Sequence, residues 1–359
     1  MERTTNSIEM LGLLVQPGFC VSGGKVTKVN PAAAALLIEE GEEIAPRLLT
    51  GKDEYAAFSG GSLYLTLDVS GQPCGCCVTR MNEIDIFLID QEADQAELQA
   101  MALAARELRE PLANVMITAN RLFPVAGLSD DPQTQDQISR LNRGLYQMLR
   151  VISNMSDAGR LSAGRASASE TVNITQLMDE ILVKARDAVS QLGITLHYEG
   201  PEMPIFTLAD SQLLERAVLN ILSNAVKFTA QGGSIRVSFS RTGNRMRLTV
   251  QDDGQGISQD LLGSIFHRYL RQPALEDSRY GIGLGMVLIR AAAASHGGTV
   301  LIDQPEGAGA RITLTLAIRQ SSDSMVRSKL LRIDYAGERD HTLLELSGSL
   351  PAHLYDVKD

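Results

Sequence analysis

Residues 215–229 read ERAVLNILSNAVKFT, a helical stretch that carries polar side chains on one face of an apolar pattern. Asn220, Asn224 and Lys227 are four and three residues apart, which places them on the same side of an α-helix. An asparagine offers a neutral oxygen of the kind that Mg²⁺ prefers, and a lysine supplies a cation for phosphate oxygens. Any one of these residues alone could equally be an ordinary solvated position. The rest of the sequence has to decide between the two interpretations.

The first supporting segment is DDGQGI, which runs from Asp252 to Ile257 after the strand-like stretch MRLTV. It combines a carboxylate with Gly254 and Gly256. A buried carboxylate accepts a hydrogen bond from an exocyclic amine such as that of adenine, and glycines let a flat base approach the backbone. The segment therefore predicts an adenine-binding pocket.

Two further segments follow along the chain. IFHRYLR contributes Phe266, Arg268 and Tyr269 before a polar loop, and GIGLG begins at Gly281. GIGLG lies where a loop enters a helix, whose free N–H groups and positive dipole end suit an anion. Its other candidate binding residues are Gly283, Leu284 and Gly285.

These four segments, in this order and spacing, resemble the N, G1, F and G2 boxes of the catalytic domain of bacterial sensor histidine kinases, a GHKL-type ATP-binding domain. The resemblance implies that the ligands are ATP and Mg²⁺. It implies that Asn224 is the principal metal ligand with Asn220 assisting, that Lys227 contacts phosphate and that Asp252 binds adenine. The other implied nucleotide-binding residues are Gly254, Gly256, Ile257, Arg268, Tyr269, Gly281, Gly283, Leu284 and Gly285.

Outside these boxes the chain alternates strand and helix patterns from about residue 170 to 320, which is typical of an α/β sandwich. SHGGTV and EGAGARITLTL resemble the closing strands of the same domain, with His296 in a structural turn. Residue 220 is asparagine, whereas gyrase-like and mismatch-repair ATPases of this superfamily have a catalytic glutamate there. The resemblance therefore implies a domain that is not built for rapid hydrolysis.

Before this domain lies a long helical period with two heptad seams, separated by the polar stretch LSDDPQTQDQ. Two antiparallel helices joined by a short loop cannot bury both seams, so two chains are expected to combine as a four-helix bundle. The alternative is that the seams pack against another domain of the same chain. The seam residues are Leu98, Met101, Ala105, Leu108, Leu112, Val115, Ala119 and Leu122, then Ile138, Leu141, Leu145, Met148, Ile152 and Met155.

One segment of this chain departs from the family's pattern, at the box that carries the phosphoacceptor histidine. AARELREPLANVM matches the box except that Arg106 occupies the position of the phosphorylated histidine, with Glu107 beside it. An arginine is always protonated and accepts no phosphoryl group, and the first histidine of the chain is His197. We therefore assign no catalytic residue and expect no autophosphorylation at the family site.

The first ninety residues alternate short apolar runs with turn residues, which predicts a small antiparallel sheet with a short helix in NPAAAALLIEEG. PGFCVSGGKVTKVNPAAAALL resembles the opening of a PAS domain, a sensor module. Three cysteines, Cys74, Cys76 and Cys77, crowd into CGCC. Adjacent strand residues face opposite sides, so we expect no metal or redox site there.

The resulting expectation is an α+β multidomain chain of four parts. These are a PAS-like sensor domain (1–90), a dimerisation hairpin (91–165) after which GRLSAGRASASE serves as linker, the ATPase domain (170–320), and an extension without a motif (321–359). The net charge of −10 argues against nucleic-acid and anionic membrane surfaces. Without a secretory signal or an apolar run of membrane-spanning length, we expect a cytoplasmic protein.

Three functional hypotheses remain open. The chain is a pseudokinase that signals by binding ATP, or a kinase whose target histidine lies on a partner such as a second kinase. A soluble GHKL serine kinase or ATP-dependent binding module is the third. A homodimer is expected, and a response regulator or a histidine-bearing partner kinase is the candidate for a further partner.

Overall fold

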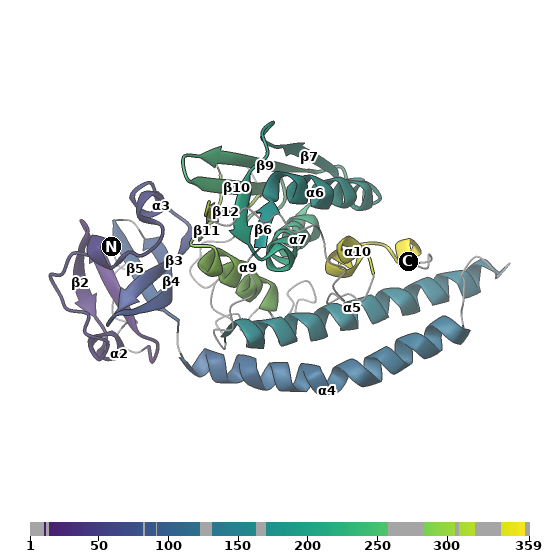
Figure 1. Ribbon diagram of the computed structural model, residues 1–359, viewed down its shortest axis with the longest axis horizontal. Helices are drawn as coiled ribbons and strands as arrows, with labels where there is room; N and C mark the ends of the chain where they lie inside the picture. Colours follow the sequence, from purple (N-terminus) through teal and green to yellow (C-terminus); the bar gives the residue numbers. More distant parts are fainter. Residues whose placement is uncertain are drawn as a thin grey trace.

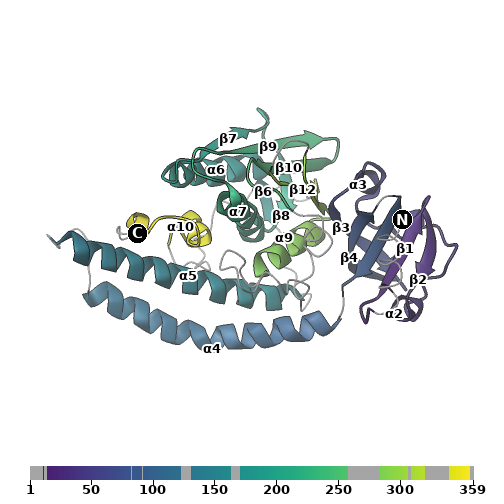
Figure 2. The same cartoon turned by 180° about the vertical axis from the view of Figure 1, so that it is seen from behind.

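The computed structural model describes residue 11 and residues 14–81, 83–90, 92–122, 131–162, 170–257, 283–305, 309–319 and 339–355. The chain forms a mixed α/β architecture of several parts, as the sequence predicts. Figures 1 and 2 show a β-rich N-terminal unit at one end, a long helical hairpin, and a second α/β unit above that hairpin.

The N-terminal unit is an antiparallel sheet with short helices. Its strands are β1 (Gly18–Ser22), β2 (Lys25–Val29), β3 (Ser62–Val69), β4 (Gln72–Met81) and β5 (Ile84–Ile89), and its helices are α2 (Pro31–Ala34), η1 (Ala45–Arg47) and α3 (Lys52–Ala56). The Asn30 side chain caps α2 by accepting a hydrogen bond from the backbone N–H of Ala33. The helix has one turn, shorter than the alanine-rich stretch suggests, and Leu37 reverses the chain with a φ of 60°.

The second α/β unit places three helices on one face of a sheet (Figure 1). The strands are β7 (Thr195–Glu199), β9 (Ser234–Thr242), β10 (Arg245–Asp252), β11 (Thr299–Asp303) and β12 (Arg311–Ala317), and the helices are α6 (Ile174–Ser190), α7 (Ser211–Phe228) and α9 (Leu284–Ser295). Alternate strand residues and the apolar faces of the helices form one core. A small two-stranded sheet pairs β6 (Glu170–Asn173) with β8 (Phe206–Ala209).

The two units share one sheet. Among the described residues, ten strands follow the order β2-β1-β5-β4-β3-β11-β12-β10-β9-β7. The joint is an antiparallel pairing of β3 with β11, in which Tyr64 lies opposite Val300. Arg290 of α9 reinforces it with an ion pair to Asp90 at 3.1 Å and by lying over the Tyr64 ring.

Cys76 and Cys77 face different cores at this joint. Cys76 packs into the N-terminal unit, whereas Cys77 packs into the core of the second unit. Burial raises the pKa of both thiols well above the ordinary value for cysteine. Because the two side chains point into different cores, Cys76 and Cys77 do not face a common ligand, as expected for adjacent strand residues.

The hairpin consists of α4 (Glu92–Leu122) and α5 (Pro132–Ser162). Helix α5 begins inside the stretch predicted as a polar loop, because Asp131 accepts hydrogen bonds from the N–H groups of Gln133 and Thr134, and Pro132 suits the first helical position. It also runs into the predicted linker. A Cβ at Gly159 would lie 2.3 Å from Ala102, so this small residue lets α4 and α5 pack closely.

Each heptad seam divides into a buried half and an exposed half. On α4, the half at Leu98, Ala105, Leu112 and Ala119 is buried in the chain, as are Ile138, Leu145 and Ile152 on α5. The other half points to solvent at Leu108, Val115, Leu122, Leu141 and Met148, which are 40–67% exposed. The prediction that the hairpin alone leaves an apolar stripe is confirmed.

The C-terminal segment fills the space between α5 and the second unit (Figures 1 and 2). It consists of α10 (His341–Leu346) and η4 (Ala352–Tyr355). Leu344 is fully buried in the hairpin core, whereas Leu346 and Leu350 belong to the core of the α/β unit. The segment for which the sequence predicted no role therefore joins two parts of the fold.

Across the described residues, no helix combines the length and apolar character needed to cross a membrane.

Candidate functional site

Helix α7 positions the polar residues with which the sequence analysis began. Asp210 caps the helix by accepting a hydrogen bond from the N–H of Leu213 at 3.0 Å, and apolar residues around it pack into the core. The helix ends at Phe228, so Asn220, Asn224 and Lys227 lie along its last turns. The predicted helical face is therefore present as one line of side chains.

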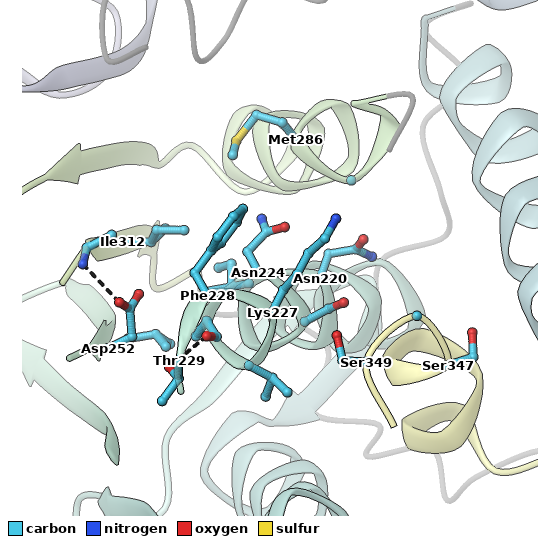
Figure 3. Close-up of a pocket in the computed structure, with 18 of the residues that line it drawn as sticks. Asn220, Asn224, Lys227, Phe228, Thr229, Asp252, Met286, Ile312, Ser347 and Ser349 are labelled. Carbon is cyan, nitrogen blue, oxygen red and sulfur yellow. Dashed lines mark hydrogen bonds between the residues drawn. The ribbon is translucent and has the colours of Figure 1, made fainter. Parts of the chain in front are cut away.

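A cavity of about 890 Å³ opens along this line. Figure 3 shows Asp252 at one end and Ser347 and Ser349 at the other, with the α7 residues between them. Such a volume suits a nucleotide-sized ligand. The predicted residues that line it are Asn220, Asn224, Lys227, Asp252, Gly256, Ile257, Gly283, Leu284 and Gly285.

Asp252 at the end of β10 is fixed by two backbone groups. Its Oδ1 accepts hydrogen bonds from the N–H of Gly254 at 3.0 Å and of Ala310 at 3.1 Å. Burial raises the pKa of this carboxyl above its ordinary value, and the two hydrogen bonds lower it in part. Gly254 lies outside the cavity lining and is required because a Cβ there would lie 2.2 Å from the carbonyl oxygen of Phe228.

Asn220 is 2% exposed and lies against the start of α9. A Cβ at Gly285 would approach its Oδ1 to 2.6 Å, so the glycine allows the two helices to meet. Asn220 donates a hydrogen bond to the carbonyl oxygen of Arg216 at 2.8 Å, and its Oδ1 faces the guanidinium of Arg150 at 3.4 Å. Helix α9 begins at Leu284, and its N-cap residue Gly283 has a φ of 80° and no side chain to cap the helix. Gly283 therefore leaves the first N–H groups of α9 for a ligand to bind.

Asn224 and Lys227 supply the groups that a magnesium nucleotide requires. Asn224 is partly exposed, and its side chain makes no hydrogen bond to another described residue, which leaves its oxygen available. The described residues contain no cluster of three carboxylate, histidine or cysteine ligands. An amide oxygen and an ammonium group at the same cavity fit Mg²⁺ bound together with phosphate oxygens, since this ion is usually held by few protein ligands.

Three predicted nucleotide-binding residues, Arg268, Tyr269 and Gly281, lie outside the described residues, as does the stretch before Gly281 that the sequence predicts to be a polar loop. Arg106 and Glu107 are both exposed on α4.

His296 is buried in the structure. Its Nε2 accepts a hydrogen bond from the N–H of Asp210, and its Nδ1 contacts the carbonyl oxygen of Ala292. These contacts agree with a structural role.

Sequence reasoning missed two groups of cavity residues. The first group is Phe228, Thr229, Met286 and Ile312, and the alternation of apolar residues in RITLTLA is a sequence signal that could have identified Ile312. The second group is Gln147, Arg150, Val151 and Asn154 of α5 with Ser347, Gly348 and Ser349 after α10. No motif connects these two stretches with the nucleotide-binding boxes.

Comparison with known proteins agrees with this arrangement. Residues 209–320 match the family described as histidine kinase-, DNA gyrase B-, and HSP90-like ATPase. The histidine protein kinase DivJ of Caulobacter vibrioides is 30% identical over 240 residues, which cover 63% of this chain and 40% of DivJ. The sensor protein KdpD of Clostridium acetobutylicum is 26% identical over 226 residues, which cover 60% of this chain and 25% of KdpD.

Among solved structures, full-length ShkA in complex with AMPPNP has a similar fold, with a TM-score of 0.50 and 24% identity. The match covers 63% of this chain and 47% of ShkA. The chain thus spans less than half the length of each of these three proteins.

Proposed function

Because this chain belongs to the sensor histidine kinase family, with a GHKL-type ATP-binding domain, we propose that it is a signalling protein that binds Mg-ATP without phosphorylating itself. The observation that carries the proposal is the cavity of about 890 Å³. It brings together Asp252, the amide and ammonium groups of α7, and the start of α9, which the sequence keeps far apart.

Each group of residues along the cavity binds a different part of the nucleotide. Asp252 accepts a hydrogen bond from the adenine amine, since its Oδ1 is already fixed by two backbone N–H groups. Asn224 is the principal Mg²⁺ ligand with Asn220 beside it, and Lys227 contacts phosphate. When bound, the metal neutralises phosphate charge, and the α9 N–H groups add a positive dipole end.

Arg106 limits the chemistry that nucleotide binding can lead to. It is exposed on α4, and a guanidinium has no lone pair available for in-line attack on a phosphoryl group. Two mechanisms are consistent with this: ATP binding switches the hairpin between packings, or the chain phosphorylates a histidine of a partner protein. A response regulator or a second kinase would then receive the signal.

A homodimer is part of the same proposal. The exposed half-seams at Leu108 and Val115 of α4 and at Leu141 and Met148 of α5 form an apolar stripe on the hairpin. A second copy of the hairpin would cover the stripe as a four-helix bundle. The N-terminal unit, for which we propose a PAS-like sensor role, is connected directly to α4.

Calorimetry of purified protein tests the nucleotide assignment. We expect Mg-ATP to bind more tightly than Mg-GTP, because a guanine oxygen cannot donate a hydrogen bond to Asp252. Asp252→Ala should lower ATP affinity by about 1–3 kcal/mol, the cost of an unpaired buried polar group. Asp253→Ala, next to it on the chain, is the control and should leave adenine affinity unchanged. Equal affinities for both nucleotides, unaltered by Asp252→Ala, would overturn the assignment.

A further inference from the structure

The far wall of the cavity comes from outside the matched family domain. Ser347, Gly348 and Ser349 follow α10, and Arg150 belongs to α5, yet all four line the same cavity as Asn224. Neither segment lies within residues 209–320. The cavity is therefore completed by the helical hairpin and the C-terminal segment.

Ser347, Gly348 and Ser349 form a turn, here called the serine turn, that is held by hydrogen bonds from α5 and from within the C-terminal segment. Gln147 of α5 donates a hydrogen bond from Nε2 to the carbonyl oxygen of Ser347 at 2.9 Å. The N–H of Ser349 donates to the carbonyl oxygen of Leu346 at 2.8 Å, and Arg143 reaches the carbonyl oxygen of Leu350 at 3.3 Å. A turn restrained in this way presents its hydroxyl groups in a fixed arrangement.

The Ser347 hydroxyl has a binding capacity that the described residues leave unused. Ser347 is 0% exposed, and its Oγ has no hydrogen-bond partner among the described residues. A buried hydroxyl without a partner costs free energy, which an acceptor atom of a ligand in the cavity would recover. Figure 3 shows Ser349 of the same turn on the side toward Lys227.

Arg150 places a cation at the end of the cavity that the serine turn forms. Its Nε donates to Glu345 Oε2 at 3.0 Å, and its Nη2 lies 3.1 Å from Ser223 Oγ and 3.4 Å from Asn220 Oδ1. The guanidinium is thus oriented before any ligand arrives, while 21% of the side chain stays exposed. A guanidinium matches phosphate oxygens in charge and geometry.

We propose that Arg150, Ser347 and Ser349 bind the terminal phosphate of the nucleotide. Asp252 marks the adenine end of the cavity, and Asn220, Asn224 and Lys227 lie between it and these three residues (Figure 3). A nucleotide bound with adenine at Asp252 therefore extends its phosphates toward Arg150. This inference rests on the proposed function, and it makes the hairpin and the C-terminal segment sensitive to whether ATP or ADP is bound.

The test compares Mg-ATP with Mg-ADP by calorimetry on the full chain. Arg150→Gln should reduce ATP affinity by about tenfold to a hundredfold, as expected for a lost hydrogen bond to a charged group, and change ADP affinity by less than about twofold. The double variant Ser347→Ala with Ser349→Ala should show a smaller, equally ATP-selective loss. Because it removes no ion pair, it keeps the test valid if Arg150→Gln loosens the fold.

Two controls sharpen the comparison. Ser153 of α5 is also buried with an unpartnered hydroxyl among the described residues but lies outside the cavity lining, so Ser153→Ala should leave both affinities unchanged. Asp252→Ala should weaken ATP and ADP equally. Equal losses for both nucleotides in the Arg150 and serine variants, or no loss, would overturn this inference alone. Failure of the unmodified chain to bind either nucleotide would overturn the proposed function together with it.

Discussion

Glu345, which is completely buried in α10, lies 3.0 Å from Arg150 of α5 and 3.2 Å from Arg216 of α7. One carboxylate thus joins the C-terminal segment, the hairpin and the helix that lines the nucleotide cavity. Arg216 also pairs with Asp157 of α5, so the two arginines and two carboxylates balance in charge. These ion pairs connect the helix that lines the cavity to the hairpin.

We expect Glu345→Gln to destabilise the protein by about 3–5 kcal/mol, because it leaves Arg150 and the buried Arg216 with a single carboxylate, Asp157, in place of two. Urea unfolding monitored by circular dichroism measures the change. Asp136→Asn serves as a control, since the Asp136–Arg140 pair is exposed and worth about 0–1 kcal/mol. Equal, small losses in both variants would mean that the cluster does not hold the segment in place.

The exposed half-seam should mediate dimerisation. We expect the unmodified chain to have twice its monomer mass in light scattering at micromolar concentration, and Leu108→Asp with Met148→Asp to give monomers. Leu103 provides a control, because it is 66% exposed but does not belong to the seam. It lies five residues before Leu108 and therefore points about 140° away from it around the axis of α4. Leu103→Asp should therefore remain dimeric. A monomeric unmodified chain would contradict the bundle.

Stability should fall as pH decreases from about the ordinary histidine pKa, because of His296. Burial lowers the pKa of His296 below the ordinary histidine value of 6.5, so the unfolded chain binds a proton in a range where the folded chain does not. The stabilising effect is complete above pH 6.5 and is lost as pH falls through the lowered value. Unfolding free energies between about pH 8 and pH 5 should decline less steeply in His296→Gln. Parallel pH profiles for the two proteins would rule out this role.

The local parts of the site could be predicted from the sequence. Asn220, Asn224 and Lys227 share a face because of helical spacing alone, and the DDGQGI and GIGLG segments carry glycines where backbones must approach. In the structure these approaches are the contacts of Gly254 with Phe228 and of Gly285 with Asn220. Residue type and spacing were sufficient because each requirement is local.

The long-range parts could not be predicted. A heptad pattern is the same whether its partner lies in the same chain or in a second one, so the sequence placed Leu145 and Leu108 in equivalent positions. The structure buries the first in the hairpin and leaves the second 48% exposed. Likewise, no local signal connects Ser347 to Arg150 or the edge of β3 to that of β11, because both depend on how distant elements pack.

In the function proposed above, the chain binds Mg-ATP and lacks only the acceptor for its phosphoryl group. Purified protein incubated with γ-labelled Mg-ATP should form no acid-labile, base-stable phosphohistidine. Arg106→His should become labelled, since Glu107 stands beside it as a proton acceptor, and adding Asp252→Ala to that variant should reduce the label. Acid-labile label on the unmodified chain would contradict the claim, and mapping it would identify another acceptor.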